Sequence, residues 1–245
     1  MIKIGLLGAA GRMGRAIAEL AAETGVTLTG GVDRDGAVFG PHADAARLAL
    51  ATDVMIDFST PDALARHLDV ARVDGGAIVI GTTGLAAEHH RAIDVAAQDV
   101  AVLQAANMSL GVNLLAALVT QAAVRLGHDW DIEVLEMHHR HKLDAPSGTA
   151  LLLGEAAAAG RGQVLEEVAF DRNGKREVGS IGFASMRGGS VAGDHQVILA
   201  AEGERLELGH RAESRAIFAR GALKAALWLA GKPAARYTMA DVLGL

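Results

Sequence analysis

Apolar residues in the first hundred positions fall into short continuous runs, each followed by a turn and an amphipathic segment. The apolar runs are residues 2–7, 26–32, 54–59, 77–80 and 100–103. Such runs are typical of parallel strands that are buried on both faces. The segments that repeat apolar positions at helical spacing are residues 12–23, 61–73 and 86–98. This alternation predicts an α/β fold with a Rossmann-like parallel sheet in the N-terminal domain.

The pattern changes after a long apolar helix that we expect over residues 110–126, where Gly127 ends it. Residues 131–138 then alternate between polar and apolar, as in a strand with one solvated or cavity-lining face. A helix is expected from Gly148 to about Ala158, and a polar, glycine-rich connection starts at Gly160.

Three more strands complete the second half of the chain. They are expected over residues 181–186, 195–201 and 205–210, with Glu202-Gly203 as a hairpin turn. These elements predict a C-terminal α+β domain with a mixed or antiparallel sheet. A final apolar helix over residues 214–229 is expected to return to the first domain. We therefore expect a dinucleotide-binding domain at 1–109 plus 215–245, and a substrate-binding and oligomerisation domain at 110–214.

Composition narrows the possible partners. The chain has 245 residues, about half of them apolar, a net charge of −6 with both signs interspersed, and no cysteine. This charge argues against a nucleic-acid partner, because proteins that bind nucleic acids usually carry a basic stripe. The missing cysteines exclude disulfides and thiolate metal sites. The N-terminal apolar run is too short for a membrane span and has no signal-peptide features, so we expect no membrane association and a cytoplasmic protein.

A glycine-rich turn follows the first predicted strand. It reads Gly8-Ala9-Ala10-Gly11-Arg12-Met13-Gly14, and a helix and a second strand that ends at Asp33 come after it. In dinucleotide-binding domains the glycines let the backbone approach a pyrophosphate, and an acid about 20 residues later bonds the ribose hydroxyls. We therefore expect residues 8–13 and Asp33 to bind a nucleotide. The alternative is an ordinary tight turn between a strand and a helix.

Arg34, directly after Asp33, bears on which nucleotide is bound. A lone carboxylate favours NADH because it repels a 2′-phosphate, whereas an adjacent guanidinium can pair with that phosphate. Arg12 could assist from the start of the first helix. We expect NADH and NADPH both to be used. The alternative for Arg34 is a solvated turn residue.

Two more strand ends carry small or polar residues. They read Gly81-Thr82-Thr83 and Ala105-Ala106-Asn107-Met108. Ligands of open parallel sheets lie outside the carboxyl ends of the strands, so we expect both segments to contact the cofactor. For the threonine hydroxyls the alternative is helix capping.

The most unusual segment is a basic cluster, His138-His139-Arg140-His141-Lys142, followed by a capped helix start at Pro146-Ser147-Gly148-Thr149. A metal site is one interpretation, but the spacing lacks two histidines one helical turn apart and a carboxylate ligand. Solvated, structural histidines are a second. The third is an anion site with proton donors, in which His139, Lys142 and the backbone N–H groups of Gly148 and Thr149 hold a small dicarboxylate. Histidine or lysine can supply a proton near neutral pH.

These residues make the chain similar to a known family. From Gly8–Gly14 through Gly81–Gly84 and Ala106–Ser109 to His138–Ala150, the segments resemble those of the 4-hydroxy-tetrahydrodipicolinate reductase (dihydrodipicolinate reductase) family in order. Supporting matches are Ile181-Gly182-Phe183, Gly193-Asp194-His195 and Phe218-Ala219-Arg220-Gly221-Ala222. The resemblance covers the whole chain. Asp33 stands where a glutamate is common in the family, and the shorter acid leaves more room for a 2′-phosphate.

The resemblance implies an NAD(P)H-dependent oxidoreductase of lysine (diaminopimelate) biosynthesis that uses no metal. It would reduce (2S,4S)-4-hydroxy-2,3,4,5-tetrahydrodipicolinate to (S)-2,3,4,5-tetrahydrodipicolinate. His138 would be the proton donor and acceptor, Lys142 a proton donor, and His139, Gly148 and Thr149 the carboxylate-binding residues. The family also implies a cytoplasmic homotetramer joined through the sheets of the C-terminal domain.

Two other functions compete with this interpretation. Another two-domain reductase, such as an aspartate or homoserine pathway dehydrogenase, would have elements in a similar order, but the first of these needs a catalytic cysteine. A nucleotide-sensing regulator would leave residues 138–149 unexplained. Measuring whether the protein oxidises NADH when given the product of the preceding synthase distinguishes the reductase from these alternatives.

Overall fold

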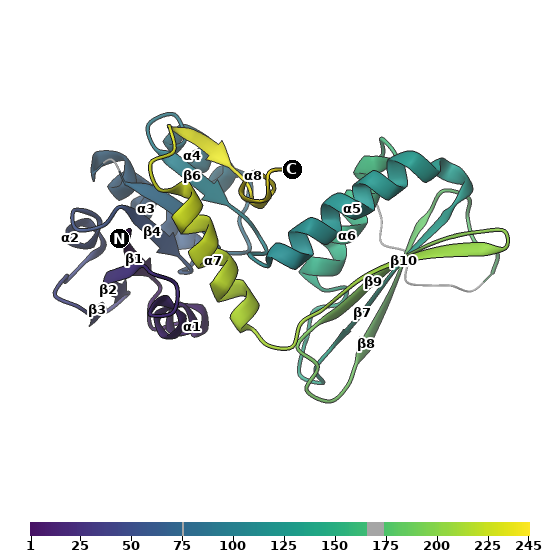
Figure 1. Ribbon diagram of the computed structural model, residues 1–245, viewed down its shortest axis with the longest axis horizontal. Helices are drawn as coiled ribbons and strands as arrows, with labels where there is room; N and C mark the ends of the chain where they lie inside the picture. The colour runs from purple at the N-terminus through teal and green to yellow at the C-terminus, as the bar shows by residue number, and fades with distance from the viewer. Residues whose placement is uncertain (75, 166–173) are drawn as a thin grey trace. The chain divides into compact units, whose positions relative to one another are not determined.

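The computed structural model describes residues 1–74, 76–165 and 174–245 of the chain. It divides into two compact units, and Figure 1 shows the elements of each. Unit 1 contains Met1–Leu110 and Ala216–Leu245, and unit 2 contains Gly111–Arg215.

Unit 1 is built on a seven-stranded sheet in the order β11-β6-β5-β4-β1-β2-β3. All neighbouring strands are parallel except β2 and β3. The strands are β1 (Lys3–Leu7), β2 (Thr27–Asp33), β3 (Gly36–Phe39), β4 (Val54–Asp57), β5 (Ala77–Ile80), β6 (Ala101–Gln104) and β11 (Ala235–Tyr237). The helices are α1 (Arg12–Ala21), α2 (Ala45–Ala49), α3 (Pro61–Asp74), α4 (Ala87–Ala96), α7 (Ala216–Leu229) and α8 (Met239–Leu243).

Both faces of this sheet are covered, which explains why its strands are apolar without alternation. Successive side chains point to opposite faces. Val79 therefore packs in the core formed with α1 and α7, whereas Ile78 and Ile80 pack in the core formed with α2, α3 and α4. Because β2, β1, β4, β5 and β6 are parallel neighbours, their carboxyl ends lie at one edge of this covered sheet.

Unit 2 has a four-stranded sheet in the order β10-β9-β7-β8. Strand β7 is parallel to β8 and antiparallel to β9, and β9 is antiparallel to β10. The strands are β7 (Asp131–His138), β8 (Ile181–Arg187), β9 (Asp194–Ala201) and β10 (Glu204–Arg211), and the helices are α5 (Leu110–Leu126) and α6 (Gly148–Gly160), with a short 3₁₀ turn, η1 (Gly127–Asp129). Figure 1 shows α5 and α6 on one side of this sheet, where Val134 and Val197 meet Leu115 and Leu153.

The main elements agree with the sequence pattern, and the expected fold class is confirmed. Besides the 3₁₀ turn η1, four short elements were not expected: β3, α2, β11 and α8. The chain turns back from β2 at Arg34-Asp35, and Gly36, the first residue of β3, has a positive φ of 108°. Three to five residues are too few for a hydrophobic period to be visible, so tertiary pairing defines these elements. Part of the polar connection after Gly160 lies outside the described residues.

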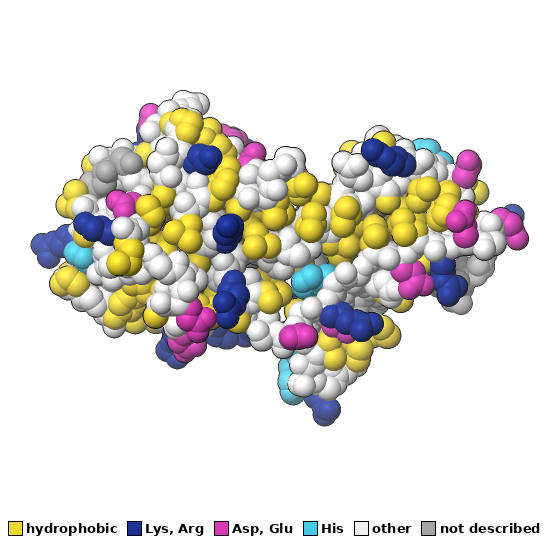
Figure 2. Space-filling view, viewed as in Figure 1, with side chains coloured by type: hydrophobic (Ala, Val, Ile, Leu, Met, Phe, Trp, Pro, Cys, Tyr) yellow, Lys and Arg dark blue, Asp and Glu magenta, His cyan; other side chains and the backbone are white. Residues whose placement is uncertain are grey.

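Helix α5 carries apolar side chains on its exposed side as well as on its buried side. The stretch Leu110–Asp129 is long and apolar enough to cross a membrane by length and composition alone. Figure 2 shows apolar side chains gathered over this helix, and Leu114 and Leu118 are exposed. However, Val119 is fully buried in the core of unit 2, and a core helix passes the same test of length and composition. This feature alone is weak support for a membrane span.

Candidate functional site

The glycine turn of unit 1 uses most of its own N–H groups. The N–H groups of Gly8 and Ala9 donate to the carbonyl of Val32, and that of Ala10 donates to Asp33 Oδ2 at 3.0 Å. Helix α1 begins at Arg12, and Gly11 before it supplies no side-chain cap. Because the first N–H groups of a helix have no intrahelical acceptor, those of Arg12 and Met13 are the donors that this turn can offer to an anion.

Two glycines keep this turn close to its neighbours. Gly8 has a φ of 76°, and a Cβ there would lie 2.6 Å from the carbonyl oxygen of Phe58 on the adjacent strand end. A Cβ on Gly14 would lie 2.5 Å from the carbonyl oxygen of Gly8. Both positions exclude a side chain, so the backbone can approach a pyrophosphate as closely as the dinucleotide fingerprint requires. The residues present therefore fit a nicotinamide dinucleotide.

A cavity of about 480 Å³ opens beside this turn. Of the residues expected from the sequence, Gly8, Gly11, Asp33 and Arg34 line it. Ser59, just after the end of β4, also lines it, as its place at the same sheet edge predicts. Arg66 and His67 of α3 line it as well and were not expected. Its volume lies in the range of small-molecule sites, which supports its use by the nucleotide.

The strand end at Gly81-Thr82-Thr83 is tied to a buried carboxylate. Asp57 is fully buried at the end of β4, and the Thr82 hydroxyl donates to its Oδ1 at 3.3 Å. The Ser59 hydroxyl donates to the same oxygen at 2.6 Å, and His67 Nδ1 lies 2.8 Å from Oδ2. The Thr82 hydroxyl therefore holds the sheet edge together, while Thr83 is exposed at that edge.

The segment Ala105–Met108 follows β6, next to β5 at the same sheet edge. Ala105 donates its N–H to the carbonyl of Ile80, and Asn107 Oδ1 accepts from the N–H of Ser109. The Met108 side chain is buried in the core, so only its backbone is near the edge. Ala106 is the exposed residue of this segment. The structure thus brings the predicted cofactor residues to one edge of the unit 1 sheet.

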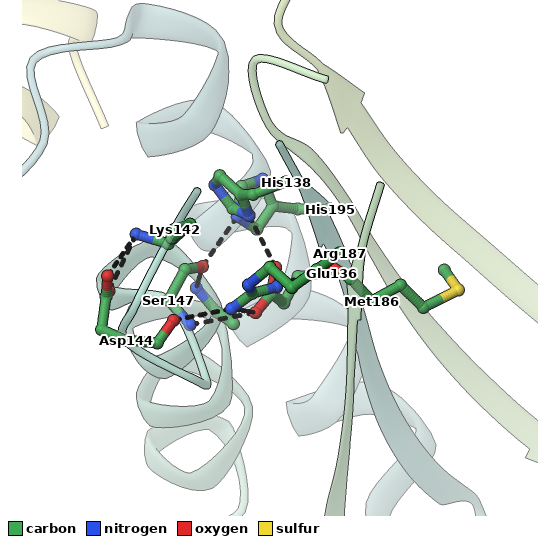
Figure 3. A network of polar contacts seen from close by, with 9 residues as sticks. Glu136, His138, Lys142, Asp144, Ser147, Met186, Arg187 and His195 are labelled. Atoms are coloured by element: carbon green, nitrogen blue, oxygen red, sulfur yellow. Dashed lines mark hydrogen bonds and ion pairs between the residues drawn. The ribbon is translucent and has the colours of Figure 1, made fainter. Parts of the chain in front are cut away.

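In unit 2, the basic cluster begins at the last residue of β7, where a buried carboxylate stands behind it (Figure 3). Glu136 and His138 lie on the same face of the strand, and Glu136 Oε2 is 2.6 Å from His138 Nδ1. Arg187, at the end of the adjacent strand β8, bonds both carboxylate oxygens of Glu136 at 2.8 Å. The Nδ1 atom of His138 is therefore committed to Glu136, and Nε2 is the atom left for chemistry.

The Glu136 carboxylate is kept ionised by the groups that it contacts. Burial raises the pKa of Glu136, but the bonds to Arg187 and His138 outweigh it, so the pKa of this carboxyl lies below its usual value. Glu136 is therefore a carboxylate at neutral pH, and it accepts hydrogen bonds from Arg187 and from the N–H of Ser147. Gly193 lies beside the other ring nitrogen, because a Cβ there would be 3.0 Å from His138 Nε2.

A second buried histidine packs against the first. The ring of His195 on β9 meets the ring of His138 edge-on, with centroids 5.0 Å apart, and its Nε2 lies 3.0 Å from the Ser147 hydroxyl. Burial and then the charge at His138 lower the pKa of His195 to about 4, so this ring is neutral near pH 7. Its packing therefore supports His138 without adding a charge.

The chain turns directly after β7. The N–H of Lys142 donates to the carbonyl of His139, which closes the turn. Lys142 Nζ lies 2.8 Å from the Asp144 carboxylate and thereby lowers the pKa of that group. Burial first, and then the cations Arg215, His138, His141 and Lys142, lower the pKa of His139.

Helix α6 begins beside this turn. Ser147 is its N-cap, and its hydroxyl accepts from the N–H of Ala150. The N–H of Ser147 itself donates to Glu136 Oε1 at 3.2 Å, which fixes the helix start to β7. Gly148 and Thr149 are the first two helical residues. Nothing lies within 4 Å of a Cβ built on Gly148, so the space in front of the helix is open on that side.

Ser147 was expected at the capped start of the helix, but the roles of three residues behind the cluster were not expected from the sequence: Glu136, Arg187 and His195. Alternation along β7 could have placed Glu136 on the face of His138, but Arg187 and His195 come from strands that only the sheet order places beside β7. Arg140 and His141 are exposed and still have no role. Within the described ranges, no group of three or more histidine and acidic residues could hold a metal ion.

The chain is similar to known reductases over its whole length. The family model described as "Dihydrodipicolinate reductase, N-terminus" matches residues 2–108, and "Dihydrodipicolinate reductase, C-terminus" matches 111–243. A 4-hydroxy-tetrahydrodipicolinate reductase of Zymomonas mobilis subsp. mobilis is 62% identical over 100% of this chain and 98% of its own. One from Parvibaculum lavamentivorans is 52% identical over 100% and 98%.

A solved structure has the same fold. It is described as dipicolinate-bound dihydrodipicolinate reductase from Paenisporosarcina sp. TG-14 and has a TM-score of 0.81. It is 22% identical in sequence, and the match covers 98% of each chain. At this sequence identity the match shows only that the two proteins share a fold.

Proposed function

This chain belongs to the dihydrodipicolinate reductase family, and from that premise we propose how its own residues carry out the reaction. It is an oxidoreductase that reduces 4-hydroxy-tetrahydrodipicolinate to tetrahydrodipicolinate with NAD(P)H, in lysine biosynthesis. The observation that carries the assignment of roles is the buried Glu136–His138 pair at the start of the basic cluster, next to the first turn of α6.

We propose that the substrate's carboxylates bind at the first turn of α6. The N–H groups of Gly148 and Thr149 point out of a helix N-terminus, which favours negative charge. His139 adds an imidazole that its lowered pKa keeps mostly neutral at pH 7, so it acts as a hydrogen-bond donor. Lys142 adds a full positive charge. A dicarboxylate such as dipicolinate, which the related solved structure binds, matches this set of donors.

The open space at Gly148 gives a direct test of this carboxylate site. We expect Gly148→Ala to raise KM for the substrate, and Ki for dipicolinate, by about tenfold or more, because the new methyl group occupies the space of a carboxylate oxygen. Folding should be unaffected, since a Cβ there meets nothing within 4 Å and φ is not in the positive region. Steady-state kinetics with dipicolinate as inhibitor measures both constants.

Gly76 provides the matched control. A Cβ on it also meets nothing within 4 Å, but it lies in unit 1, before β5. Gly76→Ala should leave KM and Ki unchanged. Unchanged constants in Gly148→Ala, or inhibition by dipicolinate that does not compete with substrate, would contradict the proposed carboxylate site.

We propose that His138 and Lys142 handle the protons of the reaction. The cofactor supplies the hydride when it is bound. The 4-hydroxyl leaves as water: a neighbouring C–H gives up a proton and the leaving oxygen gains one, so this elimination is neutral in protons. The hydride then adds to the resulting conjugated imine, and the atom that gains negative charge takes up one proton, which a positioned side chain can deliver. Glu136 holds the His138 ring with Nε2 turned away from the carboxylate, and Lys142 carries an ammonium group at the next turn. The bond from Lys142 to Asp144 keeps that ammonium in place before substrate competes for it.

The cofactor is assigned to unit 1, where Arg12 and Met13 offer N–H groups to the pyrophosphate. Asp33 and Arg34 stand at the adenine ribose end, and Gly81–Thr83 with Ala105–Met108 lie at the end expected for the nicotinamide ribose. We propose that both NADH and NADPH are accepted, since an acid and a guanidinium line the same cavity.

We further propose a cytoplasmic homotetramer that forms through the outer face of the unit 2 sheet. This face carries apolar side chains, including Leu135, Met137 and the half-exposed Met186, and neither α5 nor α6 covers it. Sedimentation equilibrium should give four times the chain mass of 25.2 kDa. Met186→Lys should yield smaller species, whereas Val73→Lys, an exposed position on α3, should not. A wild-type monomer would refute this assembly.

A further inference from the structure

The cavity of unit 1 carries positive charges that its own carboxylates do not neutralise. Two acids line it, Asp33 and Asp44. Both are occupied by the chain itself: Asp33 accepts from the N–H groups of Ala10 and Arg34, and Asp44 accepts from the N–H of Arg47 as the N-cap of α2. Their acceptor capacity for arginine side chains is therefore reduced.

Two exposed arginines line the same cavity from different elements. Arg34 follows β2, and Arg66 lies in the second turn of α3. Neither forms an ion pair within the part of the chain that the structure describes. Two nearby arginines, by contrast, form ion pairs. Arg47 on α2 pairs with Asp44, and Arg72 on α3 pairs with Asp69 and Asp99. The two cations that face the cavity are thus left for a ligand.

The helix that carries Arg66 is fixed at that turn. His67, the next residue, is 4% exposed, and its Nδ1 lies 2.8 Å from the fully buried Asp57 carboxylate. The same carboxylate accepts from the hydroxyl and the N–H of Ser59, just before α3. The backbone of Arg66 is therefore anchored to the end of β4, and only its side chain has freedom to adapt.

We infer that Arg66 is a specificity-determining residue that binds the 2′-phosphate of NADPH together with Arg34. A phosphate dianion accepts hydrogen bonds from several directions, and a guanidinium offers donors in a planar fork that matches it. Guanidinium groups from two elements can contact the phosphate from two sides. Arg12 does not line this cavity, so Arg66 is the second cation rather than Arg12. This inference rests on the proposed nucleotide site in unit 1.

The phosphate is the difference between NADPH and NADH, so the test compares the two. Arg66→Ala should raise the Kd for NADPH by roughly tenfold to a hundredfold and the Kd for NADH by less than about twofold. Adenosine 2′,5′-bisphosphate and adenosine 5′-monophosphate, as competitors in the same fluorescence titration, isolate the phosphate from the rest of the cofactor. Arg66→Lys keeps the charge but not the fork, and should recover part of the affinity for NADPH.

Arg72→Ala is the matched control, because it removes the same charge from the same helix outside this cavity. It should change neither Kd by more than about twofold, since exposed ion pairs contribute little. Arg34→Ala and the double variant show whether both arginines contact one phosphate, in which case their effects on NADPH are not additive.

Two results would overturn the inference. If Arg66→Ala weakens NADH and NADPH equally, Arg66 binds a part that both cofactors share. If Arg66→Ala leaves the affinity for NADPH unchanged, Arg34 alone binds the 2′-phosphate. A wrong role for Arg66 can be told apart from a wrong proposed function. If the proposed function is right, the wild-type enzyme and Arg66→Ala both still turn over substrate with saturating NADH, whatever Arg66 binds.

Discussion

Lys142→Ala is expected to lower kcat by about a hundredfold to a thousandfold while the Kd for NADH stays within about twofold, because a positioned proton donor contributes on the order of 10²–10⁴ in rate. Lys142 lies in unit 2, whereas every residue that lines the nucleotide cavity belongs to unit 1. Stopped-flow or steady-state NADH oxidation gives kcat, and NADH fluorescence titration gives the Kd.

Two further lysine variants sharpen the result. Lys142→Arg keeps the positive charge but is a very poor proton donor, so it should recover KM more than kcat. Lys224→Ala removes an exposed lysine from α7 and should change neither constant. If Lys142→Ala loses NADH affinity as strongly as it loses rate, Lys142 acts on the cofactor and its role as proton donor is wrong.

Glu136→Gln is expected to lower kcat by roughly tenfold to a hundredfold, since groups that orient a reactive histidine typically contribute that much. The variant keeps the shape but removes the charge that faces His138 Nδ1 and Arg187. The Kd for NADH should stay within about twofold, because Glu136 lies in unit 2 and the nucleotide cavity lies in unit 1. A general loss of structure would instead weaken NADH binding together with kcat.

The same substitution has a cost in stability. Glu136 is 1% exposed, and removing its charge leaves Arg187 without a carboxylate, so the free energy of unfolding should fall by about 3 kcal/mol. Urea unfolding measures this loss. Glu133→Gln, on the same strand but the opposite face, is the control and should leave kcat unchanged. An unchanged kcat in Glu136→Gln would mean that Glu136 does not act through His138.

Much of the fold could be read from local patterns. Continuous apolar runs appear as β1, β4 and β5, and the alternating run over residues 131–138 appears as β7 with the same bounds. The elements that could not be predicted are β3, α2, β11 and α8, which are too short to show a hydrophobic period. Their backbone groups are satisfied by neighbours that tertiary contacts supply, as β11 is by β6.

Four features follow from the order of residues alone: the glycine turn, the basic cluster at residues 138–142, the helix that starts at Gly148, and the resemblance to a reductase family. These features are local, because spacing along the chain sets which groups share a turn or a face. Only the tertiary structure decided what stands behind them. Arg187 reaches Glu136 from 51 residues away, and Arg66 joins Arg34 across the cavity of unit 1. Such pairings depend on strand order and helix packing, which no periodicity of the chain encodes.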